Sequence, residues 1–200
     1  MKIGAVITAA GKSSRMGAFK PLLKIGEYSV IEWIVSTFHS AGVVDIVVVT
    51  GFNSSELENN LKDLNIVFLK NHSYEYGEMF DSVKIGLDFL KDNFDKILLT
   101  PVDTPFFSAS TIKALLSSGA DASVPAFNGQ SGHPVLIDNK LINEILLYNG
   151  DAGLKGALAS ISVNVRRVEA DDSGILYNIN TQADYDAIVR FYNEHHSKHS

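Results

Sequence analysis

The sequence predicts an α/β protein with a doubly wound, mostly parallel sheet between two layers of helices, a three-layer α/β/α arrangement. Short apolar runs rich in β-branched residues alternate with segments whose apolar residues recur at three- and four-residue steps. This alternation is typical of parallel strands joined by right-handed helical crossovers. No linker, repeat or low-complexity segment divides the 200 residues. We therefore expect one domain over residues 1–193 and a disordered tail over residues 194–200.

In the first half of the chain, predicted strands and helices follow each other regularly. Residues 3–9 form an apolar run with the length of a buried strand. Apolar residues at helical spacing follow from Ser29 to Ala41, and the β-branched run DIVVVTG starts the next strand at Asp45. We expect further strands at 65–70 and 96–105, and further helices at 53–64 and 83–94.

The second half of the chain is less regular. We expect short strands at 121–127, 133–138 and 162–170, and helices at 139–149 and 152–161. Thr181 and Asp184 have the spacing of a capping box, which predicts the start of a final helix over 181–195. Three of the six histidines lie in the segment NEHHSKHS at the end of the chain, which we interpret as a solvated terminus rather than a metal site.

Composition argues against several classes of function. The net charge of −6 disfavours nucleic-acid binding, and no run reaches the ~20 apolar residues that cross a bilayer. The chain has no cysteine, which excludes disulfides and thiolate zinc sites. We expect a cytoplasmic protein with no nucleic-acid or membrane partner. A cluster of cations near the start still suits a small phosphate ligand: Lys12, Arg15, Lys20 and Lys24.

The segment ITAAGKSSRMGAFKPLL, residues 7–23, follows the first predicted strand. Its GKS triplet invites comparison with a P-loop, but that pattern requires glycine at position 6, where the chain has Val6. The dinucleotide fingerprint fails too, because Ser13 stands at its second glycine position. Both standard nucleotide signatures are therefore excluded.

The same segment nevertheless has the features of a phosphate-binding loop. Small residues, among them Gly11, let backbone N–H groups approach an anion closely. Arg15 and Lys20 add positive charge, and a guanidinium suits phosphate oxygens. The loop leaves the carboxyl end of a strand, which is where open α/β sheets bind their ligands. We expect a phosphate site here.

The segment resembles the signature loop of the MobA-like nucleotidyltransferases and looks closest to their molybdenum cofactor cytidylyltransferase branch. The resemblance covers nearly the whole chain. Similar family motifs occur, in the same order and spacing, at 49–57, 74–87, 98–107, 132–137, 150–158 and 178–185. It implies the Rossmann-like fold of these enzymes, with CTP and a phosphate acceptor as substrates and Mg²⁺ as cofactor.

The resemblance also implies a nucleotide site. Arg15 and Lys20 match the catalytic cations that stabilise triphosphate charge, and Ala10 stands where guanylyl-transferring relatives carry glycine, which favours CTP. Gly77 and Ser82 match residues beside the base. The residues expected to bind nucleotide are Ala9, Ala10, Gly11, Lys12, Ser13, Ser14, Gly17, Gly77 and Ser82.

Asp103 is the expected metal ligand and the third catalytic residue. It follows an apolar strand between Pro101 and Pro105, where an aspartate also commonly forms a turn. A carboxylate at a strand end suits Mg²⁺, which takes few protein ligands and binds phosphate oxygens. Asn178 and Asn180 stand where many cytidylyltransferases carry aspartates, and we name Asn178 as a second metal ligand, with Asn180 as the alternative. The same NINT form occurs in guanylyl-transferring relatives, so GTP stays open.

The segment Gly132, His133 and Pro134 resembles the family motif near the acceptor, so these residues are expected to bind it. A phosphate nucleophile is already ionised, so we expect His133 to position substrate rather than act as a base. Asp151 has two interpretations, as an acceptor-site group or as the N-cap of the following helix, and we favour the cap.

The resemblance leads to a functional hypothesis: CMP transfer from CTP to a phosphate acceptor, with release of pyrophosphate. It implies that the acceptor is molybdopterin carrying molybdenum, and that a molybdoenzyme is a transient partner. Guanylyl transfer and a sugar-phosphate acceptor remain open within the same class. A non-catalytic carrier of a nucleotide cofactor is the alternative from another class, and the presence of Arg15, Lys20 and Asp103 disfavours it.

Overall fold

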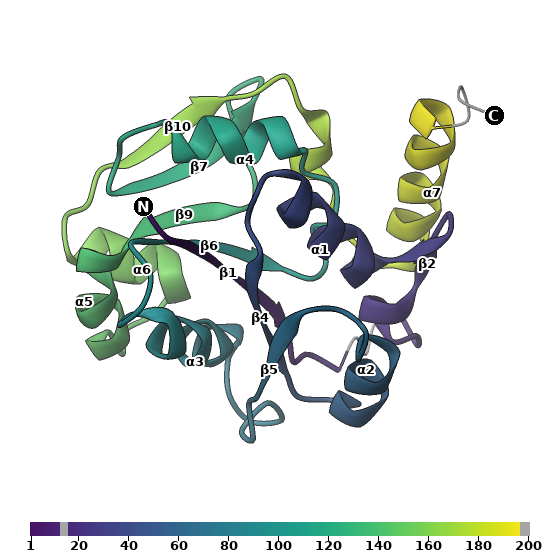
Figure 1. Ribbon diagram of the computed structural model, residues 1–200, viewed down its shortest axis with the longest axis horizontal. Coiled ribbons are helices and arrows are strands. Elements are labelled where there is room, and N and C mark those ends of the chain that lie inside the picture. Colours follow the sequence, from purple (N-terminus) through teal and green to yellow (C-terminus); the bar gives the residue numbers. More distant parts are fainter. Residues whose placement is uncertain (13–15, 197–200) are drawn as a thin grey trace.

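Eight strands form the central sheet of the computed structural model, which describes residues 1–12 and 16–196 (Figure 1). The strand order is β10-β7-β9-β6-β1-β4-β5, and β8 pairs with β7. Four neighbouring strands run parallel: β6 (Lys96–Pro101), β1 (Ile3–Ala9), β4 (Asp45–Thr50) and β5 (Ile66–Lys70). These match the strands predicted in the first half of the chain.

The other side of the sheet mixes directions. It contains β7 (Ala122–Phe127), β8 (Gln130–Ser131), β9 (Val135–Asp138) and β10 (Val165–Glu169). β9 runs antiparallel to both β6 and β7, whereas β10 is parallel to β7. The predicted α/β class with a mostly parallel sheet is confirmed, and β9 is the strand whose direction the sequence pattern does not reveal.

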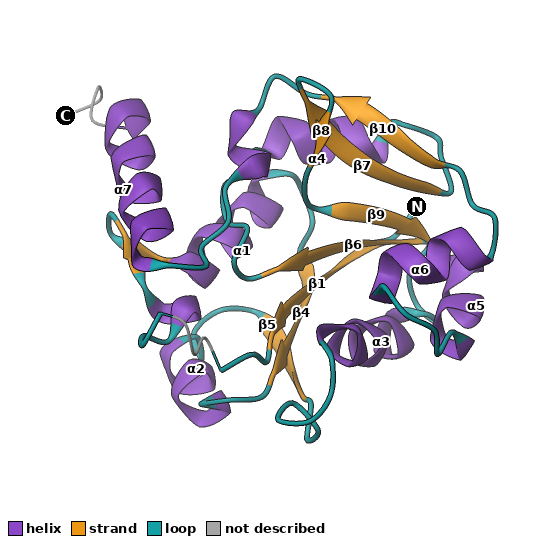
Figure 2. Cartoon of the chain, turned by 180° about the vertical axis from the view of Figure 1, so that it is seen from behind, coloured by secondary structure: helices purple, strands orange, loops and turns teal. Residues whose placement is uncertain are grey.

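Helices cover both faces of the sheet (Figure 2). Val6 and Val47 belong to the buried cluster on the face of α3 (Met79–Leu90), α5 (Ile142–Leu147) and α6 (Gly153–Ser160). Ile7 and Val48, their neighbours along the strands, belong to the cluster of α1 (Val30–Ser40), α2 (Ser54–Asn60) and α4 (Ala109–Leu116). Successive strand residues point to opposite faces, so an unbroken apolar run supplies both cores.

The final helix α7 (Gln182–His196) stands at the edge of the molecule beside the hairpin of β2 (Lys24–Ile25) and β3 (Tyr28–Ser29) (Figure 1). The predicted capping box is present, because Asp184 N donates to Thr181 Oγ1 at 3.2 Å and Thr181 N donates to Asp184 Oδ2 at 2.8 Å. The buried Ile188 anchors the helix to the core. The helix begins where the sequence predicts and runs to His196, into the segment expected to be a disordered tail.

Several short elements have no counterpart in the sequence prediction. They are α4, the hairpin β2–β3, β8, and the 3-10 helices η1 (Lys20–Leu22) and η3 (Ser173–Leu176), while η2 (Asn139–Leu141) opens the helix predicted at 139–149. The expectation that Asp151 caps α6 was wrong. The capping position belongs to Ala152, which has a left-handed backbone with φ 65°, and Asp151 lies one residue earlier. Across the described residues, every helix is too short or too polar to traverse a lipid bilayer.

Candidate active site

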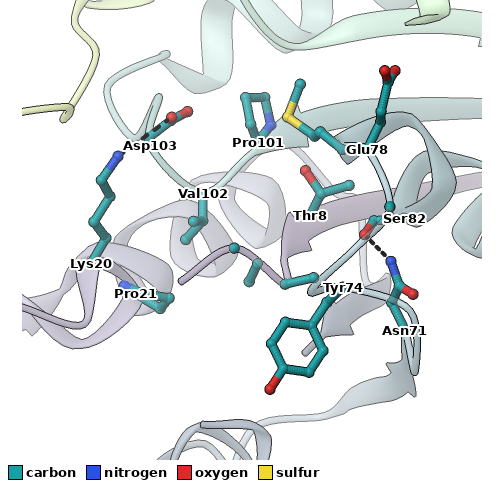
Figure 3. Close-up of a pocket in the computed structure, with 15 residues that line it drawn as sticks. Thr8, Lys20, Pro21, Asn71, Tyr74, Glu78, Ser82, Pro101, Val102 and Asp103 are labelled. Atoms are coloured by element: carbon teal, nitrogen blue, oxygen red, sulfur yellow. Dashed lines mark hydrogen bonds and ion pairs between the residues drawn. The ribbon is translucent and has the colours of Figure 1, made fainter. Parts of the chain in front are cut away.

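A pocket lies at the carboxyl edge of the parallel strands, where the loops after β1, β5 and β6 meet the first turns of α3 (Figure 3). Parallel strands place these loops at one edge, so residues distant in sequence come together there. Seven residues of the predicted site line the pocket: Ala9, Ala10, Gly11, Lys20, Gly77, Ser82 and Asp103. The other lining residues are Thr8, Pro21, Asn71, Tyr74, Glu78, Met79, Pro101 and Val102.

One end of the pocket is charged. Lys20 Nζ lies 3.9 Å from Asp103 Oδ2 and also donates a hydrogen bond to Asn180 Oδ1 at 3.3 Å. Ile179 N donates to the Asp103 carbonyl at 2.8 Å, which holds the segment before α7 against the loop after β6. The cation, the carboxylate and the amide therefore come from three separate parts of the chain.

The Asp103 carboxylate is suited to bind a cation. Burial raises its pKa, and the charges of Lys20 and His133 act in the opposite direction. A partly buried carboxylate with a raised pKa gains when a further positive charge approaches it. Within residues 1–12 and 16–196, no three acidic, histidine or cysteine side chains cluster as a metal site. Any metal at Asp103 would therefore take most of its ligands from substrate or water.

Of the two asparagines before α7, Asn180 is the one connected to this charged end. Both side chains are exposed, on either side of the buried Ile179. Asn180 also donates its backbone N–H to Asp184 Oδ2 at 3.0 Å, so the cap of α7 fixes its position. In the described part of the chain, no hydrogen bond or ion pair joins Asn178 to the Asp103 carboxylate.

The opposite end of the pocket is a buried hydrogen-bonded pair. Asn71 Nδ2 donates to Ser82 Oγ at 3.0 Å, and each residue is only 2% exposed (Figure 3). Gly77 borders this end, and a side chain there would meet Asp81 Oδ2 at 2.4 Å. Asp81 accepts the Glu78 backbone N–H at 2.8 Å at the start of α3. Gly77 therefore lets the chain approach the start of that helix closely.

The loop after β1 forms the floor between the two ends. Ala9 and Ala10 are buried, and Phe52 N donates to the Ala10 carbonyl at 3.1 Å, which fixes the loop against the end of β4. Lys12 lies outside the pocket lining, and its Nζ lies 2.8 Å from Glu75 Oε1. Gly17 is exposed, has a left-handed backbone with φ 64°, and lies outside the pocket lining. Ser13, Ser14 and Arg15 lie outside the described residues.

His133 lies in an adjoining pocket that shares Thr8, Met79 and Pro101 with the first one. Burial lowers the pKa of His133, while the Asp103 carboxylate and the Leu99 backbone act in the opposite direction. Its Nδ1 atom is buried without a hydrogen-bond partner among the described residues. A polar group of a ligand that reached this atom would supply the missing hydrogen bond.

The neighbours of His133 have structural roles in this fold. A side chain at Gly132 would meet the Ile175 carbonyl oxygen at 2.3 Å, so glycine permits the close approach of η3. Pro134 is buried at the start of β9 and follows a cis peptide bond. Packing therefore accounts for both residues, and only His133 of this motif offers an unpaired polar atom.

Sequence reasoning named Gly77 and Ser82 at this end of the pocket but missed Asn71. A single asparagine after a strand reads as a turn former, and nothing in its spacing to Ser82 shows that the two side chains meet. The available signal was the position of Asn71 directly after β5, since polar residues at carboxyl strand ends lie near ligands. Tyr74 and Glu78 line the pocket from the connection that follows Asn71, and Met79 lines it from the first turn of α3.

Comparison with known proteins gives consistent matches. Residues 5–168 match the family described as MobA-like NTP transferase domain. The chain is 27% identical over 197 residues to the molybdenum cofactor cytidylyltransferase of Escherichia coli, covering 96% of this chain and 98% of that protein. A match to the bifunctional protein GlmU of Staphylococcus carnosus has 29% identity over 61% of this chain but spans only 27% of GlmU. A solved nucleotidyl transferase from Methanothermobacter thermautotroptrophicus superimposes with a TM-score of 0.85 at 26% identity, over 97% of this chain and 99% of that one.

Proposed function

The chain belongs to the MobA-like NTP transferase family and is a nucleotidyltransferase; we propose that it transfers CMP from CTP to a phosphate of molybdenum-loaded molybdopterin. The observation that carries the proposal is the arrangement of one pocket, with Lys20 and Asp103 at one end and the Asn71–Ser82 pair at the other. Asn180 lies behind the first end and accepts a hydrogen bond from Lys20. A triphosphate would lie at the charged end and the base at the hydrogen-bonded end.

The residues of the charged end would stabilise charge in the reaction. An acceptor phosphate oxygen attacks the α-phosphorus of CTP, the bond to the bridging oxygen breaks, and pyrophosphate leaves with the electron pair. Lys20, together with Arg15 of the same loop, would neutralise charge on the triphosphate as that bond breaks. No general base is required, because the acceptor phosphate is already ionised.

Asp103 fits the role of metal ligand. Its carboxylate is 28% exposed at the pocket, and oxygen ligands suit Mg²⁺. Asn180, or Asn178 from the same segment, would add a neutral amide oxygen. Enzymes of this family generally use a divalent metal, and Mg²⁺ bound here would neutralise phosphate charge and help to orient the substrates. Lys20 would then exchange its contact with Asp103 for one with phosphate.

The acceptor would lie on the His133 side of the charged end. The unpaired Nδ1 atom of His133 offers a hydrogen-bond site next to Asp103, in a pocket otherwise lined mainly by apolar side chains. Molybdopterin as the acceptor is supported by the Escherichia coli relative, which matches this chain over nearly its full length.

The test is pyrophosphate release with each of the four nucleoside triphosphates, Mg²⁺ and molybdenum-loaded molybdopterin, with a hexose 1-phosphate as the competing acceptor. We expect release with CTP and molybdopterin at the highest kcat/KM. Nucleotide binding without pyrophosphate release would support the carrier and contradict the proposal. Turnover only with GTP or only with the hexose phosphate would contradict the assigned substrates.

The variant Ala10→Gly tests, in the same assay, whether Ala10 contributes to the preference for CTP over GTP. Ala10 lines the floor of the pocket, and a glycine there removes a methyl group beside the bound nucleotide. We expect the ratio of kcat/KM for CTP over GTP to fall about tenfold, the low end of what one methylene contributes to selectivity. An unchanged ratio would remove Ala10 from base selection.

A further inference from the structure

The hydrogen bonds at the Asn71 end of the pocket have a fixed direction. Ser73 N donates to Asn71 Oδ1 at 2.9 Å, and Asn71 Nδ2 donates to Ser82 Oγ at 3.0 Å. A backbone N–H can only donate, so the atom that accepts from Ser73 must be the amide oxygen. The amide nitrogen must then face Ser82, and the orientation of the Asn71 side chain is determined by the backbone.

This direction restricts what Ser82 can offer to a ligand. A hydroxyl has one hydrogen and two lone pairs, and Asn71 occupies one lone pair. Asn71 is the only described hydrogen-bond partner of the Ser82 side chain, so the hydroxyl hydrogen has no acceptor within the described protein. Ser82 is 2% exposed and lines the pocket, and a buried donor left unpaired is costly.

We propose that Asn71 is a positioning residue that makes the Ser82 hydroxyl a hydrogen-bond donor to the nucleobase, and so selects bases with an acceptor at that edge. The proposal rests on the nucleotide site proposed above. Cytosine offers adjacent acceptors, its O2 and N3 atoms, whereas the corresponding edge of guanine carries two neighbouring donors, N1–H and N2–H₂. A donor at Ser82 therefore favours CTP over GTP.

Asn71→Asp reverses the direction with almost no change in shape. An ionised carboxylate accepts from Ser73 N with one oxygen and from the Ser82 hydroxyl with the other. Ser82 would then present only lone pairs to the pocket. The added negative charge repels the triphosphates of CTP and GTP equally, so it weakens both affinities without changing their ratio. The ratio of the dissociation constants for CTP and GTP therefore measures the effect that depends on the base.

The experiment measures equilibrium binding of CTP and GTP, with Mg²⁺, to the wild type and to Asn71→Asp, Ser82→Ala and the double variant. We expect each variant to lower the affinity for CTP relative to GTP about tenfold, which is the value of one hydrogen bond. The double variant should match Ser82→Ala alone, because Asn71 acts through Ser82. Asn149→Asp, the same change at an exposed residue outside the pocket, should leave the ratio unaltered.

The outcomes separate this inference from the proposed function. Asn71→Asp with a wild-type ratio would overturn the role of Asn71, whatever its effect on total affinity. If Asn71→Asp does not fold, Ser82→Ala decides, and a wild-type ratio in that variant overturns the inference. A wild type that binds neither nucleotide contradicts the proposed function itself. Thermal melting of each variant identifies the folded ones.

Discussion

The two ends of the pocket are built in different ways. At the end proposed to hold the nucleobase, here called the base end, Asn71 and Ser82 are buried and joined at 3.0 Å within a chain of hydrogen bonds that starts from a backbone N–H. At the charged end, Lys20 Nζ and Asp103 Oδ2 are 3.9 Å apart, and Asn180 is exposed. In a buried pair, the direction of the hydrogen bond is set before a ligand binds. Charged side chains that stand apart form strong, charge-assisted hydrogen bonds only when a ligand binds between them. In the proposed site, base recognition would therefore be preorganised, and the charged end would be completed by substrate.

The difference follows from the elements that carry each end. Ser82 lies within α3, which packs against the sheet, and Asn71 directly follows β5. Asp103 lies in the loop after β6, and Asn180 lies in the turn before α7. A backbone hydrogen bond from Ile179 to Asp103 connects these two segments, and Lys20 Nζ contacts the side chains of both Asp103 and Asn180. Substitutions at the charged end should thus change turnover, and substitutions at the base end should change selectivity.

The largest expected effect is at Asp103. Asp103→Ala removes the carboxylate expected to hold the metal, and we expect kcat to fall on the order of 100-fold or more, as for loss of a group that stabilises transition-state charge. Pyrophosphate release with CTP measures the loss, and circular dichroism checks the fold. Asp121→Ala removes an exposed carboxylate paired with Lys140 and serves as the matched control. Undiminished turnover would exclude Asp103 from the mechanism.

Lys20→Ala should have the next largest effect. It removes the cation that contacts both Asp103 and Asn180, and we expect kcat/KM for CTP to fall about 10- to 100-fold, the range for hydrogen bonds to charged groups. The CTP:GTP ratio should stay at the wild-type value, because Lys20 lies away from the base end. Lys62→Ala, at an exposed lysine near α2, is the control. A changed ratio would argue against separate ends.

The smallest expected effect lies outside the pocket and tests whether stability alone alters activity. Glu32 accepts the Ser29 N–H at 2.6 Å in the capping box of α1. Burial raises the pKa of Glu32, but hydrogen bonds from Ser29 and the Lys24 charge outweigh it, so the pKa lies below its usual value. We expect Glu32→Ala to lower the free energy of unfolding at pH 7 by about 1 kcal/mol.

The sign of the Glu32 effect with pH follows from its lowered pKa. The pKa of Glu32 is lower in the folded protein than in the unfolded chain, so the unfolded chain holds the proton more tightly. The stabilisation is therefore complete above the ordinary glutamate pKa, and it is lost as the pH falls through the pKa of the folded state. Urea unfolding from pH 7 to pH 3 should show the difference between the variant and the wild type shrinking. Folded Glu32→Ala should retain wild-type turnover. A proportional loss of turnover would show that the measured activities track stability.

The fold was predictable wherever the chain has long apolar runs. β1, β4 and β6 are covered on both faces, so their central residues form apolar runs, and the length of these runs marks them as strands. The direction of β9 was not predictable, because the pattern VLID shows a strand but not its neighbours. α4 was missed because its apolar residues, Ile112, Leu115 and Leu116, are few and lie in a short segment with polar and small residues.

The candidate site was predictable where residue type alone carries the chemistry. Small residues and Lys20 after β1 suggest phosphate binding, and Asp103 at the end of another predicted strand suggests metal binding, before any contact is known. The role of Asn71 could not be predicted, since it depends on the orientation of one amide beside a serine eleven residues away. The contact between Lys20 and Asn180, 160 residues apart, likewise required the fold.

The most direct test of the contrast between the two ends is CTP and GTP binding by the Asp103→Ala protein. Equilibrium titration of both nucleotides should give the wild-type ratio of affinities, although the same protein no longer releases pyrophosphate. This result would show that base selection at Asn71 and Ser82 is independent of catalysis at Asp103. A ratio that collapses together with turnover would contradict the account, because base recognition would then require the charged end.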